Sequence, residues 1–139
     1  MPPDLNAASE SEKKLFKAAK SGDLATIREM VAADPSLIHA RDASACTPLH
    51  YAAWKGYPEV VAALLDAGAD IESHNQQGHW GSTPLHAAAH GGQTAVAALL
   101  IARGADVHAL NPKGMTPLQE TEVHGARAVA NLLKRHGAA

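Results

Sequence analysis

Histidine is the residue type in this sequence that most invites a chemical hypothesis, with nine copies in 139 residues. His86 and His90 have the i, i+4 spacing that places two imidazoles on one face of a helix, as zinc ligands often lie. A structural zinc site needs four converging ligands, and no Cys or acidic residue is apparent beside this pair in the sequence. His79 is the one plausible third ligand. We therefore predict no metal site and no cofactor.

Sequence patterns of common catalytic sites are missing from the chain, which has no GxSxG, no GxxxxGK[ST] and no HExxH. Glu120 and Glu122 could be imagined as a carboxylate pair, but residues two apart on a helix point away from each other, which favours solvated surface charges. Cys46 has no basic neighbour beside it in the sequence, so we interpret it as an exposed, unactivated thiol. We predict that the protein is not an enzyme and has no catalytic residues.

The overall composition limits the kinds of partner. Twelve basic and 14 acidic residues leave a net charge of −2, which offers no field to attract nucleic acid or an acidic membrane surface. The longest apolar run, residues 95–102, is too short to span a bilayer, and the amino terminus has no apolar core of the secretory type. With a single cysteine, the chain suits a reducing compartment. We expect a monomeric cytoplasmic protein that binds neither nucleic acid nor membranes.

The elements that would position these residues are set by an internal repeat. The segments TPLHYAAWKG at 47–56, TPLHAAAHGG at 83–92 and TPLQETEVHG at 116–125 begin 36 and 33 residues apart, and each precedes an apolar helical stretch. Upstream, Leu15, Ala18, Ala19 and Gly22 lie 34 residues before Leu49, Ala52, Ala53 and Gly56. The chain therefore contains four units, one of which carries three extra residues.

Each unit predicts two short antiparallel helices. The Thr hydroxyl can cap free backbone N–H groups, and Pro suits the first helical position because its missing donor costs nothing there. Glycine can take the left-handed conformation that ends a helix. The segment from Ala69 to the next Thr is rich in turn formers and holds β-branched Ile71, as a hairpin-like excursion would. The positions with these roles are Thr47, Pro48, Gly56, Gly68, Thr83, Pro84, Gly92, Gly104, Thr116, Pro117 and Gly125.

The pattern TPLHxAAxxG followed by VxxLLxxGAD closely resembles the ankyrin repeat and covers about residues 12–139. The resemblance implies an all-α solenoid of helix pairs with protruding β-hairpin-like fingers, and repeats at about 12–42, 43–75, 76–111 and 112–139 after a flexible segment, 1–11. It also implies that His50 and His86 hydrogen-bond neighbouring turns and tie one unit to the next. The first unit has lysines on its first helix and the last has Thr121 and Glu122 in place of paired alanines, so both are interpreted as capping repeats with wettable outer faces. These lysines are Lys13, Lys14, Lys17 and Lys20.

The resemblance further implies a protein-interaction scaffold that holds an unidentified partner protein in a concave groove, formed by the fingers and by the ends of the first helices. On this pattern the expected partner-binding residues are Trp54, Lys55, Gln76, Gln77, His79, Trp80, His90, Lys113, Met115 and His124. Other expected neighbours of the groove are Lys20, Ser21, Ala43, Ser44, Cys46, Ser82, Gly91, Pro112 and Val123. Fold alone does not identify the partner.

The insertion HWG at 79–81 lies at a finger tip, where a repeat stack tolerates irregularity. Trp80 and Trp54 could face one another across the groove as an adaptable contact, since Trp is enriched at binding hot spots. Trp80 could instead fold back to cover Trp54 or a neighbouring finger. An alternative function uses the Trp pair as an aromatic cage and the histidines to bind a small cation or metal.

Overall fold

The computed structural model describes residues 5–75, 83–124 and 126–138, apart from the side chains of 5–9, 123 and 124. Within these ranges the chain forms paired α-helices, one short 3-10 helix and connecting turns, and no strand. In chain order the elements are α1 (Leu5–Ser21), α2 (Leu24–Ala33), the 3-10 helix η1 (Pro35–His39), α3 (Pro48–Lys55), α4 (Pro58–Asp66), α5 (Pro84–His90), α6 (Thr94–Ala102), α7 (Pro117–His124) and α8 (Arg127–Arg135). The prediction of an all-α fold is confirmed.

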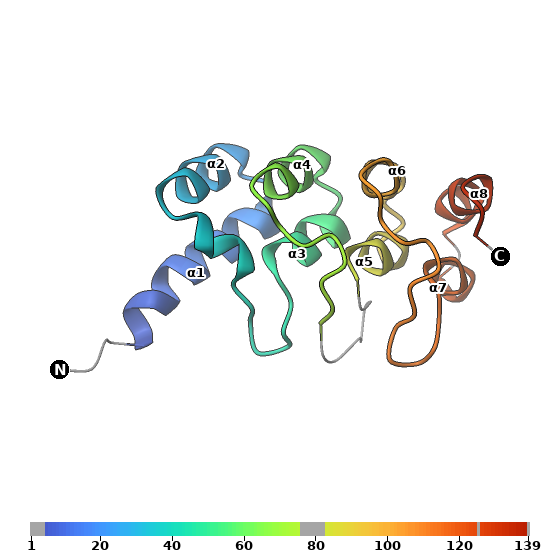
Figure 1. Cartoon of the computed structure of the whole chain (residues 1–139), viewed down its shortest axis with the longest axis horizontal. Coiled ribbons are helices and arrows are strands. Elements are labelled where there is room, and N and C mark those ends of the chain that lie inside the picture. Colours follow the sequence, from blue (N-terminus) through green and yellow to red (C-terminus); the bar gives the residue numbers. More distant parts are fainter. Residues whose placement is uncertain (1–4, 76–82, 125, 139) are drawn as a thin grey trace.

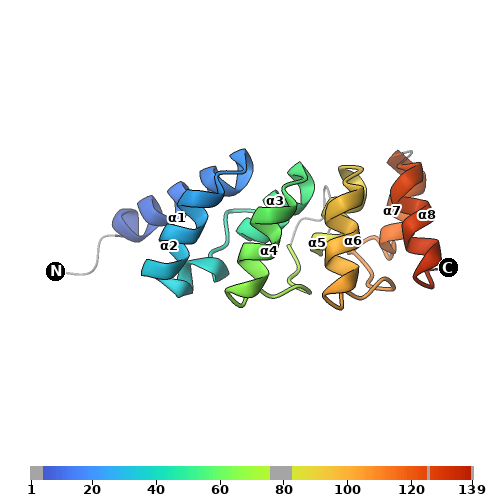
Figure 2. The ribbon, with the colours of Figure 1, turned by 90° about the horizontal axis from the view of Figure 1, so that it is seen from above.

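The helix pairs α1–α2, α3–α4, α5–α6 and α7–α8 stand in a single row with the two ends of the chain at opposite ends of the row (Figure 1). The second helices α2, α4, α6 and α8 lie side by side along the top of the row (Figure 2). The loops before α3 and α7 project to the opposite side, below the first helices (Figure 1). First helices pack on first helices and second helices on second helices, as in the predicted solenoid.

The helix boundaries follow the expected local signals. Thr47 and Thr83 are the N-caps of α3 and α5, and each is followed by Pro at the first helical position. Gly56 ends α3 with φ 85°, a left-handed conformation that costs glycine little because it has no Cβ. The boundaries of these helices therefore depend on two or three residues at each end.

The core is thin and aliphatic, as the composition indicates. One leucine in each first helix is buried, and the alanine pairs Ala18–Ala19, Ala52–Ala53 and Ala88–Ala89 lie between neighbouring first helices. These leucines are Leu15, Leu49, Leu85 and Leu118. Because alanine side chains are small, the first helices can approach closely, and a larger side chain there would force them apart.

The helix α1 begins at Leu5, inside the segment 1–11 that the sequence analysis expects to be flexible. Residues 7–14 are Ala, Ser, Glu and Lys, of which Ala, Glu and Lys favour helix, so the helix extends beyond the first unit toward the amino terminus. In the part of the chain that the structure describes, no helix is both long enough and apolar enough to cross a membrane.

Candidate functional site

The TPLH motif forms a reciprocal cap at the start of its helix. In α5, the backbone N–H of His86 donates to Thr83 Oγ1 at 3.2 Å, while His86 Nδ1 lies 2.8 Å from the same hydroxyl. Thr47 and His50 repeat this arrangement in α3. In α7, Gln119 takes the place of histidine, and its Oε1 accepts from the Thr116 backbone N–H at 2.9 Å. Both His and Gln can therefore supply the acceptor that the cap requires.

His86 has a second bond that joins two units. Its Nε2 donates to the carbonyl oxygen of Met115, 29 residues later, at 2.8 Å. Because a carbonyl only accepts, Nε2 carries the proton and Nδ1 is the acceptor toward Thr83. Burial lowers the pKa of His86, so the ring is neutral at pH 7. Both ring nitrogens are occupied, which leaves His86 no lone pair to offer a metal.

His90 is half-buried at the end of α5, where its Nδ1 lies 3.2 Å from Glu120 Oε1 on α7. Glu120 is only 7% exposed, so its interpretation as a solvated charge is wrong. Its position two residues after Leu118 faces the preceding unit rather than solvent, and the imidazole supplies the polar partner that a buried carboxylate needs. Glu122 is exposed, as expected. Among the described residues no three His, Cys, Asp or Glu side chains converge on a metal position, and His79 lies outside them.

Trp54 is half-buried at the end of α3, against the end of α5. Gln93 Nε2 donates to the Trp54 carbonyl oxygen at 3.1 Å, and a Cβ added to Gly91 would overlap that oxygen. Lys55 Nζ lies 4.9 Å from the centre of the Trp54 ring. Trp54, the end of α5 and Glu120 on α7 thus form a continuous line across three units.

Several of the expected contact residues lie outside the described residues, and so does the proposed pairing of Trp54 with Trp80. The expected contact residues that lie outside are Gln76, Gln77, His79, Trp80 and Ser82, and Gly125 of the repeat motif also lies outside. His124 is the last residue of α7, and its side chain is not among those described.

The finger before α7 is held by one asparagine. Asn111 Oδ1 accepts from the backbone N–H groups of Lys113 and Met115, each at 2.9 Å. Lys113 is exposed and Met115 half-buried. With Gly114, Gln119 and Glu122 they line an open hollow of about 530 Å³ where the finger meets α7. The finger residues of the expected site are therefore accessible here.

Cys46 is buried, with 0% of its surface exposed, so the interpretation of a surface thiol is wrong. The preceding residue, Ala45, has φ 60°, and this turn directs residue 46 inward. Asn75 Nδ2 lies 3.5 Å from Cys46 Sγ, and burial raises the pKa of the thiol. Cys46 is part of the core and not of a contact surface.

One cluster, between α1 and the first finger, was not singled out by the sequence analysis. The Tyr51 hydroxyl donates to the Asp42 carboxylate, and the Phe16 ring meets the Tyr51 ring edge-on at 5.7 Å. Burial raises the pKa of Tyr51, which keeps its hydroxyl protonated. Lys20 Nζ lies 4.5 Å from the centre of the Tyr51 ring. The signal that could have found it is the spacing of Lys13, Lys17 and Lys20, which puts three lysines on one helical face.

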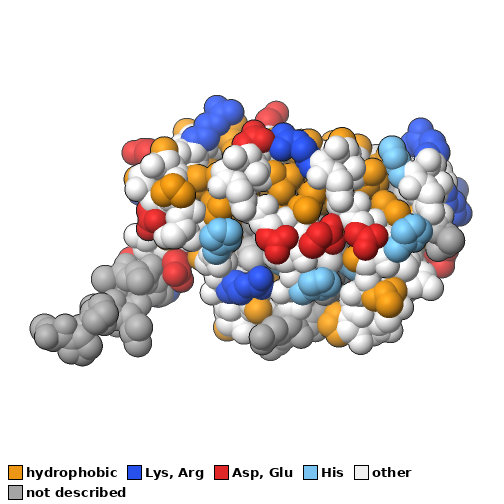
Figure 3. All heavy atoms as spheres, in the orientation of Figure 1, with side chains coloured by type: hydrophobic (Ala, Val, Ile, Leu, Met, Phe, Trp, Pro, Cys, Tyr) orange, Lys and Arg blue, Asp and Glu red, His pale blue; other side chains and the backbone are white. Residues whose placement is uncertain are grey.

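On the face shown in Figure 3, acidic side chains form a row across the middle, with basic side chains above and below the row. In the turns that follow α4 and α6, Asp70 and Asp106 are exposed and Glu72 is half-buried. Glu72 Oε1 accepts from the Asp106 backbone N–H at 2.8 Å, which links two units. Arg103 Nη1 also pairs with Asp66 Oδ1 at 2.8 Å, across the same two units. Glu72 and Asp66 therefore help to join neighbouring units.

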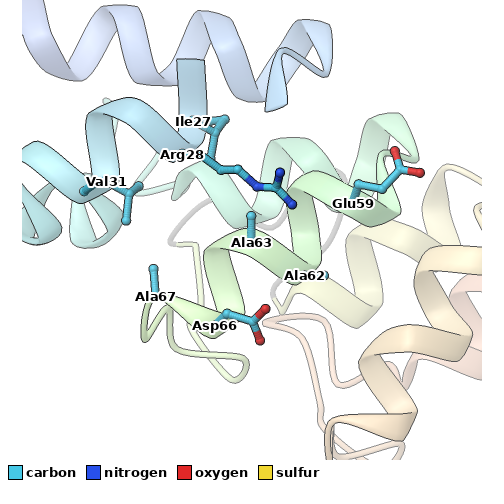
Figure 4. A pocket seen from close by; sticks show the side chains of 9 residues that line it. Ile27, Arg28, Val31, Glu59, Ala62, Ala63, Asp66 and Ala67 are labelled. Carbon is cyan, nitrogen blue, oxygen red and sulfur yellow. The ribbon is translucent and has the colours of Figure 1, made fainter. Parts of the chain in front are cut away.

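Another groove lies between α2 and α4, on the side of the row that the second helices form (Figure 4). It has a volume of about 440 Å³ and an apolar floor that includes Ile27, Val31 and Ala63. Arg28 extends over it from α2, and Glu59 and Asp66 lie along its α4 side (Figure 4). Since charges of both signs border this groove, they favour neither an acidic nor a basic ligand.

Comparison with protein families finds a model described as "Ankyrin repeats (3 copies)" that matches residues 3–75 and one described as "Ankyrin repeat" that matches residues 80–112.

Similar proteins share a part of the chain. "Probable E3 ubiquitin-protein ligase XBOS32" of Oryza sativa subsp. japonica is 45% identical over 84 residues, which cover 52% of this chain and 17% of the relative. "Serine/threonine-protein kinase VIK" of Arabidopsis thaliana is 44% identical over 62 residues, covering 45% and 14%. "Protein phosphatase 1 regulatory subunit 27" of Homo sapiens is 38% identical over 64 residues, covering 46% and 41%. The chain spans less than half the length of each of these relatives.

Proposed function

This chain belongs to the ankyrin-repeat family and is a protein-interaction module, and from this premise we propose that it binds a partner protein on its inner surface. We define the inner surface as the ends of the first helices at Trp54, Lys55 and His90 together with the finger residues Lys113 and Met115. Gln76, Gln77, His79, Trp80 and His124 belong to it by position in the repeat. The proposal includes no catalytic activity, no cofactor and no role for nucleic acid or membranes.

One observation carries the proposal: the contact line that runs across three units. Trp54 packs against the end of α5, and His90 at that end bonds to Glu120 on α7. A half-buried indole beside half-buried polar groups offers the mixture of apolar area and hydrogen bonding that interfaces favour. Because the line is continuous, a single extended segment of a partner could contact several units at once.

The relatives support a binding role without naming the partner. One is called a regulatory subunit of protein phosphatase 1, a name that implies association with another protein. The kinase and ligase names belong to proteins of which this chain matches 14% and 17%, and neither activity is part of the proposal. We propose that the protein acts as a monomeric scaffold in the cytoplasm.

The test is affinity capture from a native lysate with three forms of the protein. Wild type is compared with a Trp54→Ala, Trp80→Ala variant and with an Arg28→Ala, Glu59→Ala control on the outer groove of Figure 4. Thermal melting first establishes that all three are folded. We expect a protein that the wild type and the control retain and that the Trp variant loses. Unchanged capture by a Trp variant with a lowered melting temperature would show that the tryptophans are core residues.

A further inference from the structure

Lys13, Lys17 and Lys20 line an open cavity of about 450 Å³ together with Phe16, Ser21 and Asp42, and we call this surface the lysine cleft. We propose that the lysine cleft docks an acidic segment of the partner protein, with Asp or Glu side chains that meet the lysines and an apolar side chain between them. The inference rests on the proposed function, because it names the chemistry of a segment of the same partner.

The lysines carry charge that the protein itself leaves largely uncompensated. Among the described side chains, the one carboxylate within ion-pair distance of these lysines is Glu10, 3.7 Å from Lys13, and both groups are more than 70% exposed. An ion pair so exposed contributes little, because water and salt screen it. The ammonium groups therefore remain free to meet carboxylates from a partner.

Asp42, the acidic residue that lines the cleft, already accepts hydrogen bonds from other groups of the protein. Its Oδ1 accepts from the backbone N–H groups of Ser44 and Cys46 at 2.9 and 3.0 Å, and its Oδ2 accepts from the Tyr51 hydroxyl. The carboxylate thus has a structural role in the finger, and its hydrogen-bonding capacity is largely used. Three lysines against one engaged carboxylate leave the cleft with a net positive charge.

The floor of the cleft is apolar and packed against the rest of the protein. Phe16, which is 8% exposed, packs edge-on against Tyr51, and Lys20 lies over the Tyr51 ring. The cation–π contact restrains the Lys20 side chain, so less conformational entropy is lost when an anion binds. The lysine stems also cover apolar surface while their charges stay in water. A leucine or an aromatic side chain flanked by carboxylates would match both features.

The dimensions and surroundings favour a short protein segment over nucleic acid. Lys13 and Lys20 are seven residues apart, which corresponds to about 10 Å along a helix. Beyond the cleft, a long polyanion would approach a protein of net charge −2, in which Asp70 and Asp106 are exposed and Glu72 is half-buried. Tyr51 lies on α3, the helix that ends at Lys55 beside Trp54, so a segment bound in the cleft could continue onto the inner surface.

The test measures the fluorescence anisotropy of a fluorescein-labelled 12-residue peptide of alternating Glu and Leu, against a control peptide with Gln at every Glu. A Lys13→Gln, Lys17→Gln, Lys20→Gln variant is compared with an Arg127→Gln, Lys134→Gln, Arg135→Gln variant. The second variant removes the same charge from exposed positions on α8, at the other end of the row. Thermal melting and circular dichroism establish that both variants are folded.

We expect saturable binding of the Glu peptide by the wild type and much weaker binding of the Gln peptide. The lysine variant should bind the Glu peptide about tenfold more weakly, since each exposed ion pair contributes a factor of about two to three. The α8 variant should stay within about twofold of wild type, and added salt should weaken the binding by screening.

Four results would overturn the inference. No saturable binding by the wild type would mean that the lysines only keep the end of the stack soluble. Equal weakening in the two variants would mean attraction by overall charge. Equal or tighter binding of a 12-nucleotide single-stranded DNA would mean a general polyanion surface. When the lysine variant is added to the capture experiment, a partner lost by the Trp variant but retained by the lysine variant would refute the cleft and leave the proposed function intact.

Discussion

The first and last seams of the stack, between α1 and α3 and between α5 and α7, join their helices through the same two repeat positions with different chemistry. One position lies five residues after the buried leucine of a first helix, and the other lies two residues after the buried leucine of the next. At the first seam these positions hold Lys20 and Tyr51, in a cation–π contact. At the last seam they hold His90 and Glu120, in a hydrogen-bonded pair. The repeat determines which positions meet, and the side chains determine whether the contact is open to solvent or buried.

The comparison also distinguishes two charged residues that lie at equivalent positions of the repeat. Lys17 and Glu120 occupy equivalent positions, each two residues after the buried leucine of its unit. Lys17 is exposed because no described unit precedes α1, whereas Glu120 is buried because α5 lies against it. In the first capping repeat the charged residue at this position thus lies on the outer face of the stack. In the last capping repeat the charged residue at this position lies in the seam with the preceding unit.

Charge reversal at these equivalent positions should give the largest difference. Glu120→Lys places a cation beside His90 at a buried site, so we expect the free energy of unfolding to fall by about 3–5 kcal/mol. Lys17→Glu should change it by no more than about 0.5 kcal/mol, as at most exposed positions. Urea denaturation at pH 7 measures both. Similar losses for the two variants would contradict the difference between the outer face of the first unit and the last seam.

A methyl group at the central seam should have the next largest effect. Gly91→Ala would bring a Cβ against the Trp54 carbonyl oxygen, and we expect a loss of about 1–3 kcal/mol from overpacking. Ser21→Ala, at the equivalent position in the first unit, should stay within about 0.5 kcal/mol. Thermal and urea denaturation of both variants check this. A Gly91→Ala variant as stable as wild type would indicate that the helices can separate at little cost.

Acid should weaken the tie between the third and fourth units. Burial lowers the pKa of His86 in the folded protein below its unfolded value of about 6.5, so the unfolded chain binds the proton more tightly. The stabilisation by neutral His86 is therefore complete above about pH 6.5 and is lost as the pH falls toward the folded-state pKa.

His86→Gln provides the matching variant, since Gln119 already completes the equivalent cap in α7. The substitution keeps an acceptor for Thr83 but removes the bond to Met115, and we expect a loss of about 0.5–1.5 kcal/mol at pH 7. Its stability should also change less than that of wild type between pH 7 and pH 5. Parallel pH profiles of the two proteins, measured by urea denaturation, would assign the acid sensitivity to other groups.

The smallest effect should come from the first seam. Lys20→Gln removes the cation above Tyr51, which at an exposed site contributes about 0.5–1 kcal/mol. A double-mutant cycle with Tyr51→Leu isolates the pairwise energy from other effects of each substitution. A coupling energy of zero would mean that Lys20 contributes only through its charge.

The helix pairs could be predicted from sequence because their signals are local. Thr47 caps the helix, Pro48 starts it and Gly56 ends it, so each boundary depends on residues within a few positions of one another. The buried leucines follow from the helical period within each unit. No information about the rest of the molecule is needed for these features.

The seam contacts could not be predicted in the same way, since they join residues about 30 positions apart. His90 and Glu120 are 30 positions apart, and the sequence near either residue gives no sign that the two side chains meet. Cys46 turns inward because Ala45 has φ 60°, a conformation that is uncommon for alanine and that its sequence does not suggest. Comparing equivalent positions of adjacent units would have identified both seam pairs, once one of them was known.

The single row of units in Figure 1 determines how the molecule can open. Because the main contacts between the described helices join neighbouring units, a terminal unit can detach while the others stay folded, whereas a central unit has two interfaces to break. Amide hydrogens of α8 should therefore exchange with deuterium through a partial opening, at a lower free energy than those of α3. Such an opening separates Met115 from His86 and frees the finger that carries Lys113. Part of the inner surface would then be remodelled by fluctuations that leave the rest of the stack intact.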